Sequence, residues 1–305
     1  MSSDPRRRFA FGFTIENTST RIWFCSRTDV FVTKPFDFVK VSLFLHALYC
    51  MDPLIAVQES DTLINIITML VSADEVALGW DPTIIRGFHD DGKRYFDITV
   101  HDKNSGNKIY RTSEILFSYG ADAIRGRGTR VFEGNVLKDG GPSGPSVAIK
   151  DAWVDYDRKR EAAILADFYS KADDADKQLI HQYFLTVLAH GDVTISGNVD
   201  HTHELIRRGK AVPDGSRFPL TNLPSLQSTR GLSTGVAPMY YDSALTRVHH
   251  PTYQFSDKVH TRIVYKEVVS PIYTVKRLAD CLRILQDALR GRTCVTIMCS
   301  PADAK

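Results

Sequence analysis

Cysteine is scarce in this sequence and never occurs as a closely spaced pair. The five cysteines among the 305 residues are an odd number, lie far apart and form no C-x-x-C pattern. Such a set argues against a disulfide framework and against a structural zinc site. We expect reduced thiols at Cys25, Cys50, Cys281, Cys294 and Cys299.

A run of apolar residues long enough to cross a membrane is also missing. The longest apolar stretch, residues 41–57, is interrupted by His46, Asp52 and Pro53, which is typical of a core helix. The three arginines near the N-terminus are followed too soon by polar residues for a secretory signal. We therefore expect an intracellular protein, cytoplasmic or nuclear, without a membrane partner.

The sequence has little excess charge of either sign. A formal net charge of +2 gives no whole-chain case for binding nucleic acid. One small basic patch, Arg125, Arg127 and Arg130, has a single aromatic neighbour, Phe132. Because stacking aromatics are few, phosphate contact or plain solvation is favoured over RNA binding, and we expect no nucleic-acid partner.

Histidines gather in two places, residues 200–204 and 249–250, which could suggest a metal site. Both lie in an irregular stretch, and neither has a second cluster at ligand spacing. We interpret them as surface histidines and predict no metal site.

The first third of the chain alternates between two kinds of hydrophobic pattern. Short β-like runs are followed by two apolar helical stretches, around residues 38–50 and 61–72, and then by a hairpin signal. We expect residues 1–113 to form one α+β region. Its β-like runs cover residues 9–15, 21–25, 30–33, 95–100 and 108–112.

From about residue 115 the pattern becomes strand, strand, helix, strand. Leucines at helical spacing in residues 278–289 give the strongest periodic signal of the chain. Residues 198–257 are rich in Gly, Pro, Ser and His and predict a flexible insertion. Residues 114–305 therefore predict an α+β domain. Its other elements are strands at 130–137, 146–150, 184–189 and 262–268 and a helix at 158–169.

The sharpest local motif is Val-Ala-Ile-Lys at residues 147–150. It reproduces the strand whose lysine holds the α- and β-phosphates of ATP in protein kinases. Taken alone, the motif also fits an edge strand that ends in a solvated lysine, Lys150.

A glycine-containing turn precedes the strand that leads to this motif. Gly126, Gly128 and Thr129 lie where small residues would let backbone N–H groups approach a phosphate. The third glycine of the kinase pattern is absent, and an ordinary hairpin turn explains the segment equally well.

A carboxylate follows the lysine on the next predicted helix. Glu161 shares the apolar stripe of that helix with Leu165 and Phe168, where a carboxylate is costly unless it meets a cation. Lys150 is the natural partner, as in the lysine–glutamate pair of kinases. The alternative is that Glu161 points into water at the edge of the stripe.

The last predicted strand, residues 262–268, leads through a short connector to the leucine-rich helix. This order fits a kinase hinge, in which backbone groups near Glu267 and Val268 would meet the adenine edge. A plain core strand would have the same sequence.

Together these segments resemble the fungal-type protein kinase family, a divergent branch of the kinase-like fold. The resemblance spans most of the chain, and the string around Lys150 is its most specific part. The matching segments, in family order, are residues 8–14, 21–24, 35–38, 78–83, 126–129, 149–153 and 262–267.

The resemblance implies a protein-kinase-like N-terminal lobe, an antiparallel sheet plus a helix, after a family-specific α+β region. It implies that Lys150 contacts the phosphates of ATP, that Glu161 positions Lys150, and that residues 126–129 cover the nucleotide. The implied activity is ATP-dependent phosphorylation of protein serine or threonine. The full predicted cofactor site is Gly126, Gly128, Thr129, Lys150, Glu161, Glu267 and Val268.

The sequence departs from the family after the leucine-rich helix. No H-R-D or D-F-G string occurs, so the catalytic loop and the aspartate that binds Mg²⁺ are missing. We expect an incomplete C-terminal lobe, no catalytic residue, no Mg²⁺ held by side chains, and a truncated member that is inactive by itself.

Two alternatives stay open. One is a non-catalytic, pseudokinase-like protein that binds nucleotide or acts as a scaffold, and the other is an interaction module built on the first third. An incomplete lobe also leaves apolar surface on the last helix, so we expect a protein partner that covers it.

Overall fold

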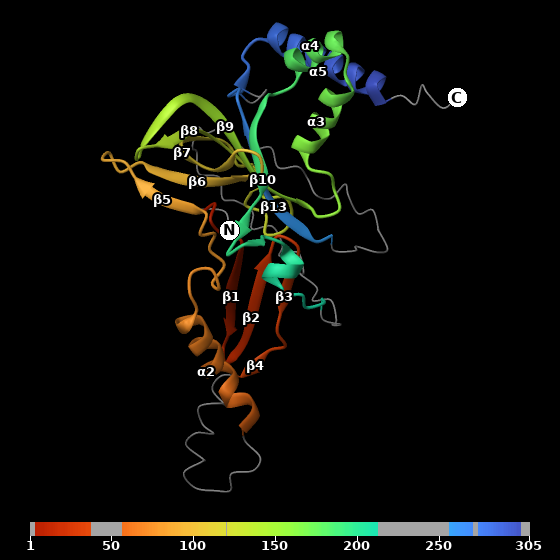
Figure 1. The fold of residues 1–305 in the computed structure, drawn as a ribbon. Helices are drawn as coiled ribbons and strands as arrows, with labels where there is room; N and C mark the ends of the chain where they lie inside the picture. The colour runs from red at the N-terminus through yellow and green to blue at the C-terminus, as the bar shows by residue number, and fades with distance from the viewer. Residues whose placement is uncertain (1–3, 38–56, 120, 213–255, 271–273, 300–305) are drawn as a thin grey trace, which may run out of the picture. The chain divides into compact units, whose positions relative to one another are not determined.

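The computed structural model describes residues 4–37, 57–119, 121–212, 256–270 and 274–299 (Figure 1). The helix expected around residues 38–50 and most of the insertion expected at residues 198–257 lie outside these ranges. None of the helices described is long and apolar enough to span a membrane.

A small antiparallel sheet opens the chain. β1 (Phe9–Glu16) and β2 (Ser19–Ser26) form a hairpin, and β3 (Val30–Val32) and β4 (Phe36–Asp37) both pair with β2. Asn17 takes the left-handed conformation that the two-residue turn requires, with φ at 56°. The β-like runs expected at residues 9–15, 21–25 and 30–33 are confirmed as these strands.

α2 (Val57–Ser72) follows, and it begins four residues before the expected start at residue 61. The chain then enters a seven-stranded antiparallel sheet with the order β10-β13-β9-β8-β7-β6-β5. The strands are β5 (Ile84–Phe88), β6 (Arg94–Asp102), β7 (Gly106–Phe117), β8 (Arg130–Lys138), β9 (Gly141–Asp155), β10 (Val187–Asp192) and β13 (Lys258–Tyr265).

The large sheet encloses the main apolar core. Along β6, buried residues alternate with half-buried ones, because successive side chains of a strand point to opposite faces. Ile98 and Val100 are completely buried and join apolar residues from the other strands.

The sheet also curls until β10 approaches β6. The His190 N–H donates to Asp102, and a Cβ atom at Gly191 would lie only 1.7 Å from the His101 carbonyl oxygen. Residue 191 must therefore be glycine for the two strands to meet so closely.

Three helices accompany this sheet: α3 (Glu161–Lys171), α4 (Asp174–Tyr183) and α5 (Leu278–Cys299). Asp173 caps α4 by accepting a hydrogen bond from the Asp176 N–H at 2.8 Å. The strand expected at residues 184–189 appears as β10, three residues later. Strand and helix content confirm the predicted α+β class.

The first residues of the predicted insertion belong to this fold. β11 (Thr194–Ile195) pairs with β12 (Asn198–Val199), and a single π-helical turn, η1 (Thr202–Ile206), follows. The His201 Nδ1 atom caps that turn by accepting from the backbone N–H groups of His203 and Glu204.

Candidate functional site

Lys150 lies in the middle of the large sheet, on β9 between β8 and β13. It is paired with Val131 on one side and with Ile263 on the other. The neighbouring Ile149 is completely buried in the main core, so Lys150 points to the opposite face together with Ala148 and Ala152.

Glu161, the first residue of α3, meets Lys150 on that face. The Lys150 Nζ and Glu161 Oε2 atoms are 2.5 Å apart, and the two side chains are 22% and 45% exposed. The second carboxylate oxygen, Oε1, accepts a hydrogen bond from the Tyr265 hydroxyl at 2.7 Å. The structure therefore brings together the lysine and the glutamate that the sequence pairs, and it adds a tyrosine that sequence reasoning missed.

These contacts determine the protonation states of Glu161 and Tyr265 at neutral pH. Burial acts to raise the pKa of Glu161, but the hydrogen bonds from Lys150 and Tyr265 outweigh it, and the pKa lies below its ordinary value. Burial and the bond to the carboxylate raise the pKa of Tyr265. Glu161 is thus an ionised acceptor, and Tyr265 is a neutral donor.

A cavity of about 240 Å³ lies beside the Lys150–Glu161 pair. Its apolar lining comes from Ala152, Val154, Ile164 and Ile263, with Thr261 beside them. Five cationic side chains and two carboxylates complete the lining, which gives the cavity a positive balance. They are Arg127, Lys150, Arg158, Lys159, Arg160, Asp155 and Glu161.

The glycine-containing turn reaches this cavity through one residue, Arg127. The Gly126 N–H donates to the Arg27 carbonyl oxygen at 2.9 Å, and the Arg127 carbonyl oxygen accepts from the Trp153 N–H at 2.8 Å. Gly128 has a φ of 52°, and a Cβ atom there would lie 2.4 Å from Arg27 Cζ. The turn therefore needs a glycine at position 128 for its close approach to Arg27.

Glu267 and Val268 follow β13, beyond Tyr265, and do not line this cavity. The Glu267 carboxylate accepts from the Thr186 N–H at 2.7 Å, while Val268 is 37% exposed. They lie at the end of β13 where Tyr265 pairs with Ala148.

A family model described as fungal protein kinase matches residues 1–296 of the chain. The chain belongs to this family. No curated protein and no solved structure gives a significant match.

In this fungal protein kinase family member, the other face of the same strands carries a buried charge network. Arg262 on β13 is completely buried; it contacts Asp151 at 2.8 Å and Asp81 at 2.6 Å. Its remaining N–H groups donate to the Thr83 hydroxyl and to the Thr99 carbonyl oxygen. Each of the three nitrogens of this buried guanidinium therefore donates to at least one acceptor.

His260 continues the network two residues earlier on β13. Its ring nitrogens lie 2.9 Å from Asp151 and 3.1 Å from Asp200, and its ring stacks on Trp153. Asp200 also pairs with the buried Arg8 at 2.6 Å. Burial alone would lower the pKa of His260, but the carboxylates raise it to about 9.

Four of the segments that carry the family resemblance each supply one charge to this network, namely Arg8, Asp81, Asp151 and Arg262. Sequence reasoning missed this network and placed Asp200 in an irregular insertion. The local signal in β13 is weak: His260 and Arg262 lie among Val259, Ile263 and Val264 in a strand that also carries Lys258 and Thr261.

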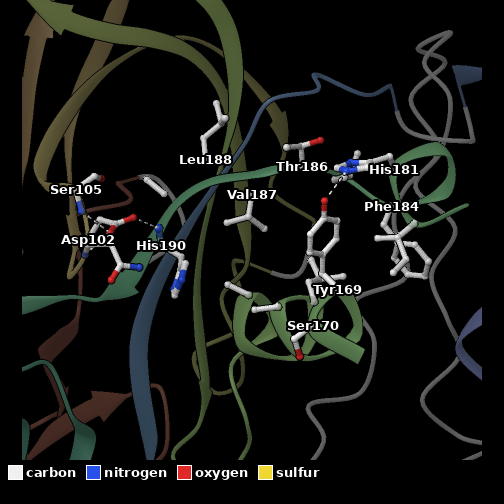
Figure 2. A pocket seen from close by; sticks show the side chains of 17 residues that line it. Asp102, Ser105, Tyr169, Ser170, His181, Phe184, Thr186, Val187, Leu188 and His190 are labelled. Carbon is white, nitrogen blue, oxygen red and sulfur yellow. Dashed lines mark hydrogen bonds between the residues drawn. The ribbon is translucent and has the colours of Figure 1, made fainter. Parts of the chain in front are cut away.

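A second cavity, of about 480 Å³, lies on the other side of α3 (Figure 2). Its lining is mainly apolar and comes from α3, α4 and β10. At its edges, the Tyr169 hydroxyl lies 3.2 Å from His181 Nε2, and Asp102 accepts from the His190 N–H. Ala162 and Leu165 of α3 line this cavity, whereas Glu161 and Ile164 line the first.

Among the described residues, no group of three or more His, Cys, Asp or Glu side chains is arranged to hold a metal ion. His201 caps η1, and His203 lies 3.0 Å from Arg207. His249 and His250 lie outside the described residues.

Proposed function

We propose that this chain supplies the nucleotide-binding part of a protein-kinase-like phosphotransferase, in which Lys150 contacts the phosphates of ATP. The observation that carries the proposal is the 2.5 Å contact between Lys150 on its central strand and Glu161 at the start of α3. A kinase needs this pair in place to hold the nucleotide.

The contacts around Lys150 suit this role. An ammonium group has three donors, and among the residues described Glu161 is the one carboxylate that pairs with it, so donors remain for phosphate oxygens. Tyr265 holds the second oxygen of Glu161 and so limits the rotation of the carboxylate. The lysine is therefore oriented before the ligand arrives.

The strand direction supports a position for the base. Ala148 lies on the same face as Lys150, two residues closer to the end of β13 that Glu267 and Val268 follow. We propose that their backbone groups meet the adenine edge, with the phosphates extending toward Lys150. Transfer of phosphate to protein serine or threonine is the activity that this binding would serve.

Thermal unfolding of the full chain with and without ATP tests the proposal. A ligand that binds only the folded state raises the melting temperature. We expect a rise for the wild type, its loss in Lys150→Ala, and no effect of the control Lys138→Ala, an exposed lysine at the end of β8. A wild type whose melting temperature does not change on addition of ATP would overturn the proposal.

A second candidate is a nucleotide-binding protein that does not transfer phosphate. The absence of H-R-D and D-F-G strings from the sequence favours it. Incubation of the full chain with Mg-ATP and a mixed protein substrate separates the two candidates, because only the first incorporates phosphate.

We also propose that a protein partner covers α5. Leu278, Leu282, Leu285 and Leu289 are between 50% and 75% exposed along this helix. Apolar surface of this kind marks an interaction site or an aggregation hazard. Sedimentation that shows a stable monomer at high concentration would count against the partner.

A further inference from the structure

The cations around the small cavity differ in whether a carboxylate already neutralises them. Arg158 pairs with Asp155 at 2.9 Å, Arg160 pairs with Asp192 at 2.9 Å, and Lys159 pairs with Asp167. Lys150 pairs with Glu161. Each of these four cations has an acidic partner.

Arg127 is the exception among the cations that line the cavity. No carboxylate of the residues described lies within ion-pair distance of its guanidinium. Its backbone is nevertheless fixed, because the Arg127 carbonyl oxygen accepts from the Trp153 N–H. Its charge acts on Glu161 only at longer range, where it helps to lower the pKa of that carboxylate. An anchored arginine that no carboxylate contacts, at the edge of a cavity with a positive balance, is suited to an anionic ligand.

The direction of β9 indicates which part of a nucleotide would reach it. The base is expected beyond Ala148, and the cavity extends the other way, past Lys150 to Ala152 and Val154. Val154 lies four residues beyond Lys150, or about 13 Å along the strand. A chain of phosphates that passes Lys150 therefore runs into the cavity, and its last member approaches Arg127.

The turn itself offers fewer backbone donors than its glycines suggest. The Gly126 N–H is already bonded to the Arg27 carbonyl oxygen, and Arg27 fills the space beside Gly128. A side-chain donor from the same turn would take the place of these backbone donors, and Arg127 is the residue of the turn that lines the cavity.

We propose that Arg127 binds the terminal phosphate of a nucleoside triphosphate and makes the site selective for triphosphates over diphosphates. The inference rests on the proposed nucleotide-binding function. A guanidinium can donate two parallel hydrogen bonds to a phosphate, which a hydrated lysine does less well. Apart from Lys150, the other cations of the cavity contribute only a general positive field.

Calorimetric titration of the full chain with ATP and with ADP, in EDTA, tests the inference. We expect the wild type to bind ATP about tenfold more tightly than ADP, since one charge-assisted contact separates them. Arg127→Ala should lose about tenfold in ATP affinity and leave ADP affinity within about twofold. Arg127→Lys should fall between the two.

Arg158→Ala is the matched control, because it removes a cation of the same cavity that already has a partner. It should change neither affinity by more than about twofold. Equal weakening of ATP and ADP by Arg127→Ala, or unchanged ATP affinity, would overturn the inference. Failure of the nucleotide site itself looks different, because the wild type would then bind neither ligand and Lys150→Ala would change nothing.

Discussion

The two faces of β9 and β13 carry charges in different environments. On one face, Asp151, His260 and Arg262 are at most 3% exposed and contact one another and further charges. On the other, Lys150 and Glu161 are 22% and 45% exposed beside a cavity. Lys150 and Asp151 are neighbours in the sequence, yet the alternation of the strand assigns them to these opposite faces.

The difference indicates two roles for charged residues. The buried charges stabilise the fold, whereas the partly exposed charges remain accessible to a ligand. A buried ion is costly unless all its partners are present, so the network around Arg262 tolerates little change. An ion pair with access to water contributes about 0–1 kcal/mol and can exchange partners at little cost. The comparison predicts that stability depends on one face and ligand binding on the other.

The largest effect should follow from Arg262→Ala. Removing the guanidinium takes from the buried Asp81 and Asp151 the cation that they share, which should destabilise the fold by about 3–5 kcal/mol. Lys150→Ala, on the next strand and the opposite face, should cost less than about 1 kcal/mol. Urea unfolding followed by circular dichroism compares the two, and a larger loss for Lys150→Ala would contradict the division between the faces.

A smaller effect should come from raising the pH. The pKa of His260 is about 9 in the folded chain, against 6.5 for an ordinary histidine, because Asp151 and Asp200 stabilise the charged ring despite its burial. Its stabilising contribution is fully present below pH 6.5 and is lost as the pH rises through about 9. The loss should amount to about 3 kcal/mol.

Urea midpoints between pH 6 and pH 9.5 measure this change, and His260→Gln should flatten the profile. If that variant does not fold, the imidazole resonances of the wild type report the same titration. A stability that increases over this range would show that His260 is neutral in the network.

The smallest effect should follow from Tyr265→Phe. Glu161 loses one hydrogen-bond donor, but its carboxylate can accept a hydrogen bond from water instead. The free energy of unfolding should therefore fall by about 1 kcal/mol or less. The pKa of Glu161 should rise, since a bond that favours the ionised form is gone. Carboxyl NMR titration measures it, and Tyr169→Phe, which alters the other side of α3, should leave that pKa in place.

The contacts that sequence reasoning predicted are those with a local signature. The strand motif fixed the face of Lys150, and the helical stripe placed Glu161 on the side that meets it. Only 11 residues separate this pair, so one strand and one helix are enough to bring it together. By contrast, Tyr265 reaches Glu161 across 104 residues, and its strand sequence would also suit a plain core strand.

The buried network could not be predicted in the same way. Arg8 and Asp200 are separated by 192 residues, and Arg262 and Asp81 by 181. Each charge taken alone looks like a residue exposed to solvent, because the partner that makes burial tolerable lies on a distant segment. The register of β9 against β13 places Asp151 and Arg262 on one face, whereas the contacts of Arg8, Asp81 and Asp200 appear only once the chain is folded.

The pairing of Arg8 with Asp200 limits where the coding sequence can be cut to express part of the protein. The expected division into residues 1–113 and 114–305 would separate a completely buried carboxylate from its guanidinium. A shortened clone that begins after residue 8 would carry the same defect, even if every strand of the large sheet were intact. Expression of this protein should therefore keep its first residues, and added tags belong at the other terminus.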